Sequence, residues 1–142
     1  MYKNILVAYD GSSFSNVALH QAADLARLCK AELHLLSIVL TTGYAALAEG
    51  MSGIDVWGLE RNQIEAALEK AAGDVGGQGL KIVTGIREGD PANEIIAHAY
   101  AIKADLAVLG HTDKGVIARL FEGSVGAKLI RDLPCSLLIA MG

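Results

Sequence analysis

The chain has 142 residues, a length typical of one domain with a single hydrophobic core, and we expect one domain over residues 1–142. Hydrophobic residues make up 52% of the chain and charged residues 20%, which excludes an intrinsically disordered protein. The formal net charge of −4 provides no general attraction to nucleic acid or to anionic membranes, so local geometry would have to hold any anionic ligand.

Strand patterns alternate with helix patterns along the chain. Short continuous apolar runs that end in turn residues predict strands, and apolar residues spaced three or four apart predict helices. In chain order we expect a strand at 4–10, a helix at 15–29, a strand at 32–39, a helix within 55–77, a strand at 80–86, a helix from 91, a strand at 104–110, a helix at 124–131 and a strand at 135–141. This alternation predicts an α/β fold with one parallel sheet and helices on both faces.

Helix starts are marked by capping residues. Ser13 or Ser15 is expected to cap the first helix, and Asp90 the third, with Pro91 at the first helical position. The Gly-rich segment 41–54 has no clean period, and two interpretations stay open for it: a functional loop or an insertion without a role.

The beginning of the chain has no long apolar segment of a signal peptide, and no apolar run is long enough to cross a bilayer. We therefore expect a cytoplasmic protein in which Cys29 and Cys135 are reduced thiols. The cysteines show no metal-ligand spacing, so no metal site is expected from them.

Motifs of the common catalytic sites are missing. The sequence has no P-loop, no G-x-G-x-x-G after a strand and no H-E-x-x-H, and "GSVG" is not a nucleophile elbow. No catalytic residue is therefore predicted, and any turnover should be slow. His20, His34 and His98 fall on helices or strands and are expected to be surface residues or hydrogen-bonded polar residues.

Two residues follow strands at the expected ligand edge of the sheet. In an open parallel sheet, ligands bind beyond the carboxyl ends of the strands, where the strand order reverses. Asp10 follows the first strand and Gly110 ends the fourth. Asp10 could bond a ribose hydroxyl or a base edge, or it could cap the turn into the first helix.

A second cluster precedes the last helix. Gly123 and Ser124 open that helix, whose free N–H groups and positive dipole end suit a phosphate. An ordinary helix start has the same appearance, so both interpretations stay open. His111 follows Gly110 and could also contact a phosphate.

Several segments together resemble the universal stress protein family: "NILVAYDGS", "LHLLSI", "EGDPANEII", "ADLAVLGH" and "EGSVGAKLIRDLPCSLLIA". The resemblance implies a doubly wound, five-stranded parallel sheet of order 3-2-1-4-5. It also implies two alternatives for function. One branch of the family binds ATP through G-x-x-G, nine residues, then G-[ST], whereas another branch lacks the motif and is not thought to bind ATP.

The resemblance assigns roles residue by residue. Asp10 matches the acid that contacts the nucleotide, and Ile38 matches the apolar residue that packs against adenine. Gly110 matches the first glycine of the motif. The remaining implied contacts are Ala8, Tyr9, Leu109, His111, Asp113, Gly123, Ser124 and Val125. The expected ligand is ATP or AMP, with or without magnesium.

Asp113 departs from the motif, because the family has its second glycine there. Aspartate adopts a positive φ more readily than most residues, at a cost of roughly 1–2 kcal/mol. A carboxylate about 4 Å from a phosphate oxygen repels it by roughly 4 kcal/mol at an effective dielectric of 20. Pairing with Lys114 or Arg119, a magnesium ion, or a side chain turned to solvent would offset that repulsion.

Two functions therefore stay open: a regulatory stress-response module that binds an adenine nucleotide, and a dimeric protein-interaction module that binds none. The interaction module would use the loop at 41–54 with Tyr44, Met51 and nearby Trp57. The family resemblance implies a homodimer on either interpretation, paired through the last strand, which would be an apolar sheet edge if left bare.

Overall fold

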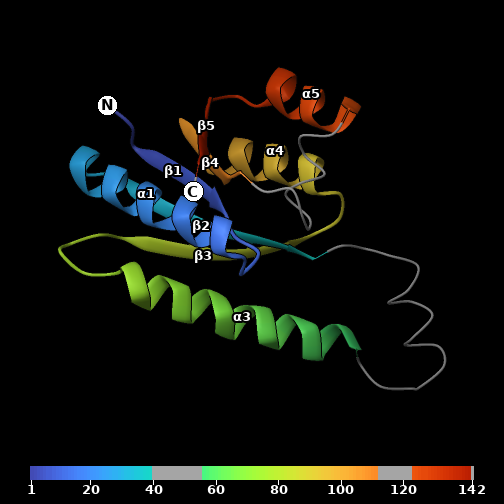
Figure 1. Ribbon diagram of the computed structural model, residues 1–142, viewed down its shortest axis with the longest axis horizontal. Helices are drawn as coiled ribbons and strands as arrows, with labels where there is room; N and C mark the ends of the chain where they lie inside the picture. Colours follow the sequence, from blue (N-terminus) through green and yellow to red (C-terminus); the bar gives the residue numbers. More distant parts are fainter. Residues whose placement is uncertain (40–55, 112–122, 142) are drawn as a thin grey trace.

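The computed structural model describes residues 1–39, 56–111 and 123–141, and of residues 56–60 and 123–126 it describes the backbone alone. Five parallel strands form one sheet in the order β3-β2-β1-β4-β5, with helices on both faces (Figure 1). The elements are β1 (Asn4–Ala8), α1 (Ser13–Cys29), β2 (Glu32–Val39), α3 (Val56–Val75), β3 (Ile82–Glu88), α4 (Pro91–Ala101), β4 (Leu106–Gly110), α5 (Gly123–Asp132) and β5 (Ser136–Ala140). The expected fold and strand order are confirmed.

The core divides into two layers because successive side chains of a strand point to opposite faces of the sheet. In β1, Ile5 and Val7 pack into the cluster beneath α1 and α3, whereas Leu6 and Ala8 pack into the cluster beneath α4 and α5. These residues are at most 4% exposed, which explains why β1 has an unbroken apolar sequence.

The cap of α1 differs from the prediction. Ser12, rather than Ser13 or Ser15, is the N-cap, and its Oγ accepts a hydrogen bond from the backbone N of Ser15 at 3.1 Å. Ser15 itself is fully buried, and its hydroxyl donates to the Ser12 carbonyl oxygen. Three serines in four positions could not be separated by sequence alone. The predicted start of α4 is confirmed, with Asp90 as N-cap and Pro91 first in the helix.

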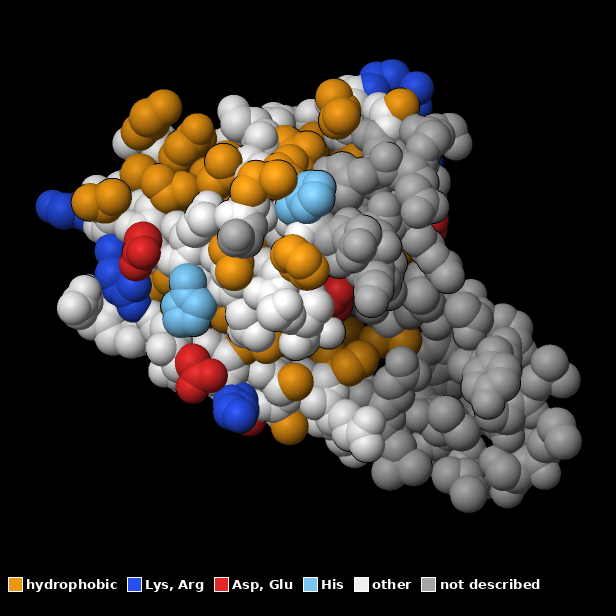
Figure 2. All heavy atoms as spheres, in the orientation of Figure 1, with side chains coloured by type: hydrophobic (Ala, Val, Ile, Leu, Met, Phe, Trp, Pro, Cys, Tyr) orange, Lys and Arg blue, Asp and Glu red, His pale blue; other side chains and the backbone are white. Residues whose placement is uncertain are grey.

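Strands β3 and β5 form the two edges of the sheet. The side chains of Leu137, Leu138 and Ile139 in β5 are half-buried. Figure 2 shows hydrophobic side chains gathered on one part of the surface, over the region where Figure 1 draws the N-terminus, the end of α1 and β5. None of the helices in the described part of the chain has the length and apolar character needed to span a membrane.

Candidate functional site

The carboxyl ends of β1 and β4 lie side by side at the centre of the sheet. The two strands pair in parallel, with Val7 opposite Val108. Asp10 follows Val7 by three residues and Gly110 follows Val108 by two. Both residues therefore lie at the carboxyl ends of the strands, on the same side of the molecule. The strand order places the switch point between these strands, as the proposed ligand site requires.

Asp10 closes the turn between β1 and α1. Its Oδ1 accepts a hydrogen bond from the backbone N of Ser12 at 2.9 Å, and Gly11 between them adopts a φ of +84°. Glycine suits this position because other residues rarely adopt a positive φ. The carboxylate is exposed, and the turn uses one of its two oxygens. Asp10 therefore has the capping role, and its second oxygen can still meet a ligand.

Tyr9 is fixed by its backbone and by its ring. Its N–H donates to the Leu36 carbonyl oxygen, and its own carbonyl oxygen accepts from the Ser37 hydroxyl at 2.7 Å. The phenol lies 3.4 Å from the Asn16 side chain, and the ring packs on the cluster beneath α1 and α3. Burial, followed by the charges of Asp74 and Asp10, raises the pKa of Tyr9. The ring is therefore half-buried against the core, and the predicted nucleotide contact of Tyr9 stays a prediction.

Gly110 has a packing role of its own. A Cβ added there would lie 2.3 Å from the carbonyl oxygen of Phe14 and 3.1 Å from the backbone N of Ser15. The end of β4 can pass this closely beneath the first turn of α1 only because residue 110 has no side chain. The glycine therefore has a structural explanation that needs no phosphate.

The two neighbours of Gly110 already make contacts within the protein. Leu109 is 1% exposed and packs in the cluster beneath α4 and α5, so its side chain belongs to the core. The backbone N of His111 donates to the Ala140 carbonyl oxygen at 2.9 Å, which removes that N–H from the amides a phosphate could use. The His111 side chain is exposed and stays available.

Ile38 lies near the end of β2, which pairs with β1. Its side chain is half-buried against the cluster beneath α4 and α5, and its partner in β3 is Arg87. An apolar side chain partly open at this edge is compatible with packing against a base. Ala8, also on that face, is 4% exposed.

The last part of the motif is described only in its backbone. Helix α5 begins at Gly123, which confirms the predicted helix start, and its first residues include Ser124 and Val125. Asp113, whose charge decides the strength of phosphate repulsion, lies outside the described residues. The structure therefore brings together Asp10, Ile38 and Gly110, and it leaves the predicted phosphate contacts as predictions.

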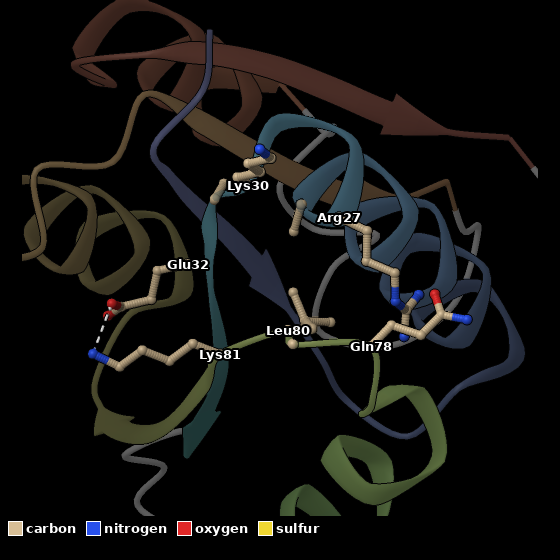
Figure 3. Close-up of a pocket in the computed structure, with 9 residues that line it drawn as sticks. Arg27, Lys30, Glu32, Gln78, Leu80 and Lys81 are labelled. Atoms are coloured by element: carbon tan, nitrogen blue, oxygen red, sulfur yellow. Dashed lines mark ion pairs between the residues drawn. The ribbon is translucent and has the colours of Figure 1, made fainter.

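A separate pocket of about 260 Å³ lies at the other end of the strands from Asp10 (Figure 3). Glu32 is the first residue of β2 and Lys81 directly precedes β3, so the pocket is at the amino ends of these strands. Figure 3 shows Leu80 in its middle, with Arg27 directed toward Gln78 on one side and the Glu32–Lys81 pair on the other.

Three charged side chains of this pocket, those of Arg27, Glu32 and Lys81, have partners within the protein. Lys81 Nζ lies 3.0 Å from a Glu32 oxygen, and Arg27 donates to the carbonyl oxygen of Val75, the last residue of α3. A cation at a helix C-terminus satisfies free carbonyls and opposes the negative end of the helix dipole. The pocket is therefore explained by helix ends and does not replace the edge near Asp10 as the candidate site.

Comparison with known proteins agrees with this architecture. A family model described as "Universal stress protein family" matches residues 1–140. The chain belongs to the universal stress protein family. Universal stress protein MJ0531 from Methanocaldococcus jannaschii is 33% identical over 139 residues, covering 98% of this chain and 82% of that protein.

Solved structures of the family share the fold. Universal stress protein UspA from Lactobacillus plantarum superposes with a TM-score of 0.80 and 26% identity, covering 98% of this chain and 97% of the other. A universal stress protein in complex with cAMP has a TM-score of 0.69 and 24% identity, with 99% and 97% covered. One from Archaeoglobus fulgidus in complex with dAMP has a TM-score of 0.67 and 18% identity, with 97% of each chain covered.

Proposed function

We propose that this stress-response family member is a regulatory module that binds an adenine nucleotide beyond the carboxyl ends of β1 and β4. The observation that carries the proposal is the parallel pairing of these strands, which puts the exposed Asp10 carboxylate and the Gly110 end of β4 at one edge. Asp10 would bond the ribose, Ile38 would pack against the base, and the start of α5 at Gly123 and Ser124 would receive the phosphates.

Related structures support an adenylate ligand. Two members with the same fold have been solved with cAMP and with dAMP, which share an adenine base and a phosphate. For this chain, adenine with at least one phosphate is therefore the proposed ligand class, and ATP or AMP are the first compounds to test. If magnesium binds with the nucleotide, the Asp113 carboxylate would serve as one of its ligands, and the ion would offset the repulsion.

A module without nucleotide is the second candidate, and three contacts favour it. The close approach of the Phe14 backbone explains why residue 110 is a glycine. The Asp10 carboxylate accepts from the Ser12 N–H, and the His111 N–H donates to the Ala140 carbonyl oxygen. Each of these residues therefore has a role in folding alone. The Asp113 carboxylate adds repulsion that an unmodified glycine motif would not have.

Calorimetry separates the two candidates. ATP and AMP are titrated, with and without magnesium, into the wild type and into Asp113→Gly. We expect tighter ATP binding by the glycine variant, by at least tenfold, because about 4 kcal/mol of repulsion is removed before screening. The gain should be smaller for AMP, which carries less charge.

The outcomes are distinct. Equal ATP affinity in both proteins would show that Asp113 does not repel the phosphates, but it would still support a nucleotide site. No heat from either protein, with nucleotide absent from the purified wild type, would favour the interaction module. Asp113→Asn is a matched control that removes the charge but keeps the shape, and it should recover most of the gain.

We also propose a homodimer paired through β5. This strand is at the edge of the sheet, and Leu137, Leu138 and Ile139 are half-buried in the single chain. Met141, directly after the strand, is 64% exposed, and the hydrophobic surface in Figure 2 lies in the same region. Light scattering should give about twice the chain mass of 14.9 kDa, and a monomer at micromolar concentration would contradict the proposal.

A further inference from the structure

Helix α4 is joined to the edge strand β3 by a hydrogen bond between two basic side chains. Arg87 Nε, near the end of β3, lies 2.8 Å from Nδ1 of His98 in α4. The imidazole lies against Gly85, where an added Cβ would be 3.4 Å from Cε1 of His98. Gly85 therefore leaves the space that the ring fills on this face of the sheet.

This contact fixes the protonation state of His98. A guanidinium has donors only, so the Nδ1 atom of His98 must be the acceptor and must carry no proton. The neutral ring then has its proton on Nε2. An imidazolium carries protons on both nitrogens, so it cannot accept from Arg87 and would place a second positive charge at hydrogen-bond distance.

Other titratable groups near this pair lie on α4 and on β2. From its own helix, Glu94 lies one turn earlier, and its Oε1 is 3.8 Å from Nη1 of Arg87. From β2, the buried His34 faces the same region, with its Nε2 3.0 Å from Oε1 of Glu32, whose other carboxylate oxygen pairs with Lys81.

Burial, followed by the charges of Arg87 and His34, lowers the pKa of His98. The neutral ring is thus the stable form near neutral pH. Glu94 offers Arg87 an alternative partner once His98 is charged.

We propose that the Arg87–His98 hydrogen bond is an acid-sensitive strap, which holds α4 against the carboxyl end of β3 near neutral pH and opens when His98 binds a proton. Arg87 is the register partner of Ile38, and Gly89 after β3 donates to the Val39 carbonyl oxygen at 2.9 Å. Opening the strap therefore changes the packing beside Ile38, whether or not that residue contacts a base.

The test is an NMR titration of the nucleotide-free protein. At pH 7.5 the ¹⁵N shifts of His98 should show the Nε2–H tautomer, and its titration midpoint should lie below about 6.5, the ordinary value of histidine. The side-chain signals of Ile38 should move with the same midpoint as His98. The Nδ1–H tautomer, or a midpoint at or above the ordinary value of histidine, would overturn the proposal.

Two variants distinguish an effect of the Arg87–His98 hydrogen bond from an effect of the burial of His98 alone. In Arg87→Met the donor and its charge are gone, so the midpoint of His98 should rise toward the ordinary value of histidine. His98→Asn keeps an acceptor near the position of Nδ1 but cannot titrate, so the acid-dependent movement of the Ile38 signals should disappear. Unchanged movement in His98→Asn, or an unchanged His98 midpoint in Arg87→Met, would overturn the strap. Because no nucleotide is present, these results do not depend on the proposed ligand.

Discussion

Gly110 and Phe14 are so close that the position of a Cβ on residue 110 is 2.3 Å from the Phe14 carbonyl oxygen. The contact joins the end of β4, one of the two strands at the candidate site, to the first turn of α1, which follows Asp10 in the chain. A motif glycine in this chain therefore shapes the site through the protein's own backbone, before any ligand is considered.

Replacing Gly110 by alanine should destabilise the protein whether or not nucleotide is present. The added methyl group meets backbone atoms, which cannot rotate away, so we expect a loss of about 2 kcal/mol or more in the free energy of unfolding. Urea denaturation measures it. Gly73→Ala is the matched control: this glycine is exposed within α3, has nothing within 4 Å of the added Cβ and should gain up to about 1 kcal/mol. Equal stability of Gly110→Ala and wild type would refute the close contact.

Ser12→Ala should weaken the start of α1. The substitution removes the Oγ that accepts from the Ser15 N–H, and loss of such a cap costs about 1 kcal/mol. Ser13→Ala is the control, because Ser13 is exposed and already inside the helix. Urea midpoints of both variants decide the matter, and a larger loss for Ser13→Ala would show that the wrong serine has been identified as the cap.

Arg27→Met should destabilise the protein through the end of α3. The variant keeps much of the apolar stem but loses the charged donor to the Val75 carbonyl oxygen, an interaction typically worth about 1.5–3 kcal/mol. Lys30→Met changes an exposed cation in the same pocket and should have little effect. Similar losses in the free energy of unfolding of the two variants would mean that the overall charge of the pocket stabilises the protein, rather than the hydrogen bond from Arg27 to the end of α3.

Local patterns in the sequence predicted most of the fold, since the strands are short apolar runs and α4 begins with Asp90-Pro91. The strand order needed the family resemblance. The serine cap and the role of Gly110 could not be predicted, because each depends on which backbone atoms approach after folding. For Asp10 the sequence left two roles open, a turn cap and a ligand contact, and the structure shows the turn cap. Arg87 and His98, eleven positions apart, carry no sequence motif, and only the packing of α4 on β3 joins them.

Stability should fall as the pH is lowered from 7 toward 5. Burial is the main cause that lowers the pKa of both His34 and His98. The unfolded chain then binds protons more strongly than the folded one, so the stabilisation is complete above the unfolded value of about 6.5 and is lost as the pH falls through the folded values. Urea midpoints at several pH values test this, and the double variant with asparagine at both positions should show a flatter profile. A midpoint that rises on acidification would contradict it.

The proposed ligand site is tested most directly by NMR mapping of ATP on the wild-type protein, with ¹⁵N-labelled backbone amides. We expect the signals of Asp10, Gly110 and Ser124 to move in a saturable way, while those of Gln78 and Leu80, at the amino ends of the strands, stay in place. Signals that do not move at millimolar ATP, or that move at the edge near Leu80 instead, would contradict a nucleotide site between β1 and β4.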